Sequence, residues 1–257
     1  MTMKFPYIWR QYLYSDNVIN LIPADLFFLF IKTLAMKFKL LGMFLFFQVS
    51  VFSQIESAEF YEKIDSLLVY WPQEKVTKCN TAIDNDELSD TEKRMVFYIN
   101  LARMDGKRFA KEIIPLYVHY NPYVNMESEY FRSLLRELVL LEELPPFLVH
   151  PLLNRLAKEK AISLKNETHI SHSGSDERFD KIFKAGGLAA GENIQAGDED
   201  PLNVVMSLLV DEGVSDYGHR RNLLDSYFSH IGLSHGSQRI YDYITIMEFA
   251  KFPDSDQ

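Results

Sequence analysis

Two histidines and one glutamate stand in three short polar motifs of this 257-residue sequence. His172 lies in Ser-His-Ser, Glu192 lies in Gly-Glu-Asn-Ile, and His219 lies in Gly-His-Arg-Arg-Asn. Imidazole and carboxylate side chains can bind metals, move protons or hold loops together. Their spacing fits neither a zinc finger nor a helix that carries two metal-binding histidines one turn apart. We therefore expect the fold to bring them together in one cleft.

These motifs and their order resemble the CAP superfamily, also called the SCP domain, which comprises cysteine-rich secretory proteins, antigen 5 and pathogenesis-related-one proteins. The resemblance is to the secreted bacterial branch and covers residues 87–252. It starts where Asn100 and Arg103 fit an Asn-x-x-Arg motif of the first helix, and it ends with residues 228–232 and an aromatic-rich strand, 241–249. The resemblance implies an α/β fold, a three-layer α/β/α sandwich with a small, mostly antiparallel central sheet.

The same resemblance maps the two histidines and the two acids of the family's cleft onto this sequence: His172, Glu192, Asp211 and His219. Glu212 competes with Asp211 for the second acid. Leu208 stands where the family usually has Trp, and the segment between the second acid and the last histidine is longer than in most bacterial members. Both departures concern the second acid of the cleft, Asp211 or Glu212. His169 competes for the first histidine, but His172 is followed by Ser-Gly and a polar stretch, as in the family.

Two imidazoles and two carboxylates permit three interpretations. Neutral imidazole binds zinc well, so His172 and His219 could hold a divalent metal such as zinc, with the acids as ligands or as their hydrogen-bond partners. A histidine beside a carboxylate can also do acid–base work near neutral pH. In the third interpretation, Glu192 and Asp211 only hydrogen-bond the histidines and backbone amides and hold the loops.

The motifs bring no nucleophile with them. We expect neither a nucleophile elbow nor a His-Glu-x-x-His helix nor a phosphate-binding glycine loop. Cys79 is the single cysteine, so the chain has no intramolecular disulfide, and we expect a quiet thiol. The function that we expect is a non-enzymatic binding module for a small molecule, a lipid or a protein partner. A metal-assisted, peptidase-like hydrolase that uses the same cleft is the alternative.

Residues 36–53 have the order of a secretory signal peptide: a basic start, a largely apolar run over 40–52, and then Ser53. The run is shorter than the roughly 20 residues that a spanning helix needs. We expect translation to start at Met36 and cleavage to follow Ser53, which would make residues 1–35 a non-native upstream extension. The alternative is a membrane anchor built from residues 26–52, but three lysines interrupt that stretch.

The mature chain is acidic. Removal of residues 1–53 takes five Lys or Arg and two Asp or Glu from totals of 27 and 36, which leaves a formal net charge of −12. A nucleic-acid partner and an anionic membrane surface both demand positive charge, so we expect neither. We expect a secreted, periplasmic or cell-envelope protein without a stable membrane span in its mature form.

Hydrophobic spacing predicts the elements that must position the cleft. Residues 54–86 are expected to form a leader helix and a linker. Further helices are expected from Ser89 or Asp90 onward, up to Pro115, over 128–143, after Pro151, over 175–184 and over 201–210. Strand candidates are 190–194, 231–234 and 242–249. In the last strand, alternation places Ile244, Ile246 and Glu248 on one face. Residues 253–257 are expected to form a tail.

Residues next to the cleft motifs are expected to have structural roles. Asn193 is expected to hydrogen-bond the local backbone, and Gly191 to allow close backbone approach in a strand. Arg220 and Arg221 are expected to form ion pairs on the surface of the helix that carries His219.

Overall fold

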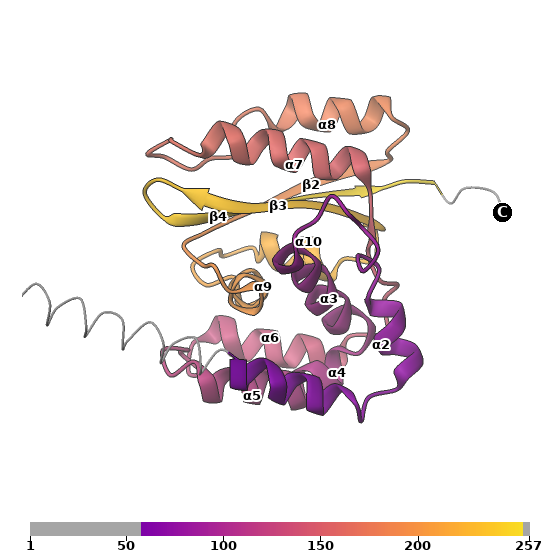
Figure 1. Cartoon of the computed structure of the whole chain (residues 1–257), viewed down its shortest axis with the longest axis vertical. Coiled ribbons are helices and arrows are strands. Elements are labelled where there is room, and N and C mark those ends of the chain that lie inside the picture. Colours follow the sequence, from indigo (N-terminus) through magenta and orange to yellow (C-terminus); the bar gives the residue numbers. More distant parts are fainter. Residues whose placement is uncertain (1–57, 254–257) are drawn as a thin grey trace, which may run out of the picture. The chain divides into compact units, whose positions relative to one another are not determined.

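A four-stranded sheet with the strand order β1-β3-β4-β2 lies at the centre of the part of the chain that the structure, a computed structural model, describes: residues 58–253 (Figure 1). The strands are β1 (Leu148–Val149), β2 (Ala189–Ala196), β3 (His230–Gln238) and β4 (Asp242–Lys251). β1 runs parallel to β3, whereas β4 pairs antiparallel with both β3 and β2. The sheet is therefore mostly antiparallel, as predicted, and the three predicted strands lie within β2, β3 and β4.

Helices cover both faces of this sheet (Figure 1). One face carries α7 (Pro151–Leu164) and α8 (Ser175–Lys184). The other face carries α3 (Asp90–Met104), α9 (Pro201–Val210) and α10 (Gly218–Leu224). The predicted three-layer α/β/α arrangement is confirmed. Beyond α3 and α9 lie α2 (Gln73–Cys79), α4 (Gly106–Arg108), α5 (Ile114–Tyr120) and α6 (Glu129–Leu140).

Apolar side chains of strand β4 pack into a hydrophobic core on each face of the sheet. Ile244 and Ile246 belong to a core cluster with Ala157 and Leu164 of α7. Met247 and Phe249 belong to the large core that includes residues of α3 and α9. Successive side chains of a strand point to opposite faces, so this alternation fills two separate cores. Glu248 shares the face of Ile246, as the sequence predicts, and therefore points toward the α7–α8 layer.

Helices α3 and α9 begin at side-chain caps. Ser89 and Glu92 form a reciprocal capping box at the start of α3, which is the predicted signal. Glu92 also accepts a hydrogen bond from the backbone of His235 at 2.7 Å, so the same carboxylate joins α3 to β3. Asp200 caps α9 by accepting from the backbone nitrogens of residues 202 and 203, each at 2.9 Å. Local sequence therefore determines where these helices start.

The predicted leader helix is confirmed in part. Residues 60–68 are helical, and Phe60, Ile64 and Leu68 are buried in the large core. The predicted linker after them is wrong in one respect, because it contains α2. The predicted helix end at Pro115 is also wrong: a π-helical turn, η3 (Phe109–Ile113), leads into α5, which has this proline in its first turn. Proline is tolerated in the first turn of a helix, where its missing N–H has no partner to lose.

All helices and strands named here belong to one compact unit that begins at Phe60. The predicted upstream extension, 1–35, and the predicted signal peptide, 36–53, lie outside the described residues, as does nearly all of the predicted tail, 253–257. Within residues 58–253, the helices are too short or too polar to cross a membrane.

Candidate functional site

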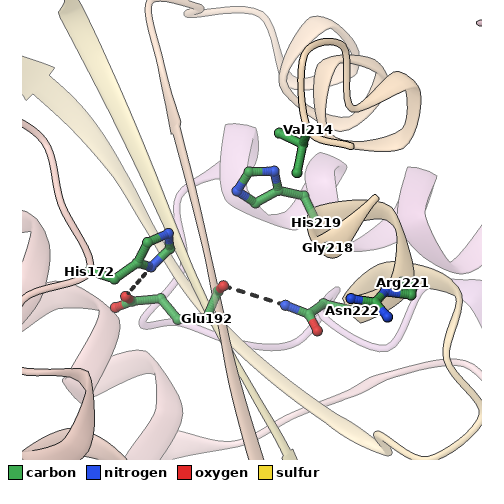
Figure 2. A pocket seen from close by; sticks show the side chains of 7 residues that line it. All are labelled: His172, Glu192, Val214, Gly218, His219, Arg221 and Asn222. Atoms are coloured by element: carbon green, nitrogen blue, oxygen red, sulfur yellow. Dashed lines mark hydrogen bonds and ion pairs between the residues drawn. The ribbon is translucent and has the colours of Figure 1, made fainter. Parts of the chain in front are cut away.

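The four predicted site residues form two hydrogen-bonded imidazole–carboxylate pairs. Nδ1 of His172 lies 2.7 Å from Oε1 of Glu192, and Nδ1 of His219 lies 2.7 Å from Oδ1 of Asp211. The centroids of the two imidazole rings are 6.4 Å apart. A pocket of about 380 Å³ separates them, and we call it the cleft. Its lining residues are His172, Glu192, Val214, Gly218, His219, Arg221 and Asn222 (Figure 2).

The two pairs are presented by different parts of the fold. His172 lies in the loop between α7 and α8, and its side chain is 54% exposed, whereas the Glu192 side chain on β2 is 2% exposed. Lys160 of α7 anchors this loop, because its Nζ donates to the carbonyl of Ser173 at 2.8 Å. Each histidine therefore lines the cleft with an accessible imidazole, and the carboxylate bonded to that imidazole is buried.

A buried guanidinium keeps Glu192 ionised. Arg178 of α8 donates through Nη2 to Oε2 of Glu192, the oxygen that His172 does not use. Burial by itself would raise the pKa of Glu192, but the hydrogen bond from His172 and the charge of Arg178 outweigh it and hold the pKa below its ordinary value. An ionised carboxylate only accepts hydrogen bonds, so Nδ1 of His172 carries the proton.

Asp211 both starts α10 and orients its histidine. It ends α9 in the left-handed region, with φ of 58°. Its Oδ2 accepts from the backbone nitrogen of His219 at 2.9 Å and from that of Arg220 at 3.2 Å. Aspartate tolerates left-handed backbone better than most residues do. Glu212 is exposed, so Asp211, and not Glu212, is the acid behind the second histidine.

Two buried arginines, Arg220 and Arg103, hold α10 in place. The Arg220 side chain is 1% exposed and donates to three backbone carbonyls, those of Leu209, Val210 and Tyr130. The predicted ion pair is present, with Glu137 at 3.1 Å, but Arg220 itself is buried and does not lie on the helix surface as predicted. Arg221 does pair on the surface, with Asp216 at 2.8 Å. Neighbouring residues on a helix point in different directions, which explains the contrast.

Arg103 of α3 supports the other end of α10. It donates to the carbonyls of Leu223 at 2.7 Å and Asp225 at 2.9 Å, and further to those of Pro145 and Phe228. The last carbonyls of a helix lack partners within the helix, and this guanidinium supplies them. The sequence motif marked Arg103 but gave it no role.

Asn193 joins β2 to α10. Its Nδ2 donates to the carbonyl of His219 at 2.9 Å, and its Oδ1 accepts from Asn222 at 2.8 Å. The predicted bond to local backbone is therefore wrong. Gly191 does sit at a close approach, but to a side chain: a Cβ atom there would lie 3.0 Å from the ring of Phe228. These contacts fix the distance between the strand of Glu192 and the helix of His219.

Serines near the cleft do not form a nucleophile elbow. Residues 232–236 match the pattern Gly-x-Ser-x-Gly, but all five lie within β3, and Ser234 pairs with Ile246 in the sheet. A nucleophile elbow needs a sharp turn from strand to helix. Ser171, which is half-buried, donates to the exposed Ser173 at 3.2 Å. His169 is also exposed and does not line the cleft.

The geometry leaves one nitrogen of each imidazole to the cleft. Both Nδ1 atoms face carboxylates, and in Figure 2 the second nitrogen of each ring turns toward the space between His172 and His219. Metal-binding histidines are typically oriented in this way by carboxylates. Within residues 58–253, however, there is no group of three or more His, Cys, Asp or Glu placed to hold a metal ion. The arrangement offers two imidazole nitrogens and no closed metal shell.

Residues 141–249 match the family model described as CAP, the Cysteine-rich secretory protein family. These residues form a CAP domain. They include all four site residues, β1 to β3 and most of β4. The protein YkwD of Bacillus subtilis is 31% identical over 96 residues, which cover 36% of this chain and 35% of YkwD. The chain thus spans about a third of the length of that curated relative.

Two solved structures are similar to part of this chain. An extracellular protein containing a SCP domain from Bacillus anthracis is 25% identical, with a TM-score of 0.32, over 42% of this chain and 34% of its own. An outer surface protein from Borrelia burgdorferi is 21% identical, with a TM-score of 0.36, over 51% of this chain and 97% of its own.

Proposed function

We propose that the CAP domain is a binding module that holds its ligand through His172 and His219. The observation that carries this proposal is that both Nδ1 atoms are bonded to buried carboxylates at 2.7 Å. With its proton on Nδ1, a neutral imidazole presents a lone pair at Nε2. The cleft therefore offers two acceptors, which suit a cation or a group that donates hydrogen bonds. A small molecule, a lipid headgroup or a protein segment with such a donor fits this description.

A metal-assisted hydrolase is the second candidate, and the imidazole–carboxylate pairs favour it because they fix the ring orientation and raise the basicity of Nε2. Two imidazoles that share one tetrahedral zinc ion, with zinc–nitrogen bonds of about 2.0–2.1 Å, have ring centroids about 5 Å apart. The observed separation is 6.4 Å. Zinc would need the exposed ring of His172 to move inward, and catalytic zinc sites usually have a third protein ligand. Binding is therefore the better-supported function.

Zinc titration followed by calorimetry, together with assays on peptide, ester and glycan substrates, separates the two candidates. His172→Ala and His219→Ala should each weaken zinc binding strongly, and Glu192→Gln should weaken it about tenfold or more. The matched control is His169→Ala, which removes an exposed histidine outside the cleft. Turnover that disappears in His219→Ala would overturn the binding-module proposal. Equal zinc affinity in wild type and His172→Ala would exclude a metal site in the cleft.

We further propose that the protein works outside the cytoplasm, secreted or in the cell envelope. The support is the order of basic, apolar and small residues over 36–53. N-terminal sequencing of the exported protein should find Gln54 as the first residue. A start before Met36, or retention in membranes after an alkaline wash, would instead support an anchor. In that case the ligands of the cleft would be restricted to those at a membrane surface.

A further inference from the structure

A second buried acid lies beneath the cleft, outside the motifs that mark the site. Glu248 of β4 is fully buried and lies directly opposite Glu192 in the register of β2 and β4. Arg178 joins the two carboxylates, because its Nε donates to Oε1 of Glu248 at 2.7 Å and its Nη2 donates to Glu192. The other oxygen of Glu248, Oε2, is buried and receives no hydrogen bond from an N–H or O–H group, whereas the two carboxyl groups lie within hydrogen-bond reach of each other when one of them carries a proton. One guanidinium is thus shared by two neighbouring carboxyl groups.

Three of the elements that pack against Glu248 place a charged group near it. Strand β2 supplies Glu192, helix α8 supplies Arg178, and helix α7 supplies Lys160, whose charge reaches the cluster while its Nζ is bonded to the Ser173 carbonyl. Strand β3 places Gly232 opposite Glu248 and adds no side chain. A second unpaired carboxylate charge is costly in such a buried place.

The two acids respond to this environment in opposite directions. Burial, followed by the negative charge of Glu192, raises the pKa of Glu248 to about 8. The pKa of Glu192 is held down, because His172 and Arg178 outweigh the effect of its burial. Near neutral pH the proton of the cluster therefore resides on Glu248.

We propose that Glu248 is a proton-carrying positioning residue for the cleft: with its proton bound, Arg178 balances the charge of Glu192, and Glu192 stays turned toward His172. When the proton leaves, Arg178 is shared between two anions, and an additional negative charge lies behind His172. The cleft then has two charge states, which differ by one proton on the buried Glu248, a residue that a ligand in the cleft does not contact. This inference rests on the proposed function only in that His172 is the residue that contacts the ligand.

The test reads the free protein by NMR and needs no ligand. In wild type, the carboxyl carbon of one 13C-labelled glutamate should titrate with a midpoint near pH 8, and the ring signals of His172 should show an inflection at the same pH. Glu248→Gln has the shape of the protonated acid and should abolish that inflection. The matched control is Glu159→Gln, an exposed acid of α7 paired with Lys181, which should leave the His172 curve unchanged.

Two results would overturn the inference. One is a wild-type protein in which no glutamate titrates above about pH 6.5, a result that needs no variant to fold and that allows for an ordinary glutamate value near 4.3. The other is a His172 curve that is the same in wild type and in folded Glu248→Gln. Neither result would affect the zinc titrations of His172→Ala, so a failure here is distinguishable from a failure of the proposed binding function.

Discussion

Asp211 holds His219 at two points: Oδ1 lies 2.7 Å from the ring nitrogen Nδ1, and Oδ2 accepts the backbone N–H at 2.9 Å. The first contact sets the tautomer and direction of the imidazole. The second caps the start of α10. One carboxylate therefore determines both where the helix begins and how its histidine faces the cleft, so stability and function are linked at this residue.

Two substitutions at Asp211 should separate these roles. Asp211→Ala removes both contacts and should lower the free energy of unfolding by about 2 kcal/mol, the upper range for a lost cap. Asp211→Asn keeps a capping oxygen and should cost less than half of that, because Asn caps about as well as Asp. Urea unfolding measures both, and the exposed neighbour Glu212→Ala should stay within about 0.5 kcal/mol of wild type. Equal losses for the alanine and asparagine variants would show that the charge, and not the cap, stabilises this turn.

The buried guanidinium of Arg103 should be among the most sensitive positions of the fold. Arg103→Met would leave the carbonyls at the end of α10 without donors, at about 1–3 kcal/mol for each buried unsatisfied group, so we expect a loss of about 3 kcal/mol or more. Arg103→Lys should rescue little, because a lysine cannot replace a planar fork of donors. The control is Arg136→Met, which breaks an exposed ion pair with Glu129 and should cost less than about 1 kcal/mol. Denaturant midpoints decide between these values.

Much of the fold could be predicted because the signals are local. Helices α8 and α9 have the predicted bounds, since Asp200 and Pro201 start one, and Gly186 and Gly187 follow the end of the other. The continuation of the helical segment past Pro115 could not be predicted in this way: a proline marks either the end of a helix or its first turn, and only the packing of the flanking segments chooses between them.

The sequence predicted the residues of the cleft motifs, but not the buried residues that support them. The motifs supplied His172, Glu192 and His219, but nothing in the sequence distinguishes Arg178 from other charged residues of its polar stretch. Glu248 occupies a core-facing position in an alternating strand, which signals a buried acid but does not name its partner. That partner comes from a helix 70 residues earlier in the chain, so only the fold shows that the two acids share one arginine.

The raised pKa of Glu248 should make the stability of the protein fall with pH. Its folded value is about 8, above an unfolded value of about 4.3, so the native state binds the extra proton between these limits. The free energy of unfolding should then decrease as pH rises from about 5 to 8, by at most about 1.4 kcal/mol per pH unit from this group. Glu248→Gln should flatten the curve in that window when urea unfolding is measured at several pH values. An unchanged slope would mean that Glu248 is ionised throughout.

Cys79 should be inert in the folded protein and reactive once the protein unfolds. Its side chain is buried, its sulfur lies 3.4 Å from that of Met104, and burial raises the pKa of the thiol to about 12. The thiolate is the species that attacks disulfide reagents, and at pH 8 this pKa leaves about one molecule in ten thousand in that form. A colorimetric thiol assay should therefore detect no cysteine in buffer and one per chain in urea, since the sequence has a single cysteine. The rise of the signal with urea should coincide with the unfolding curve seen by circular dichroism. Rapid labelling without urea would show that α2, which carries Cys79, opens from the core on its own.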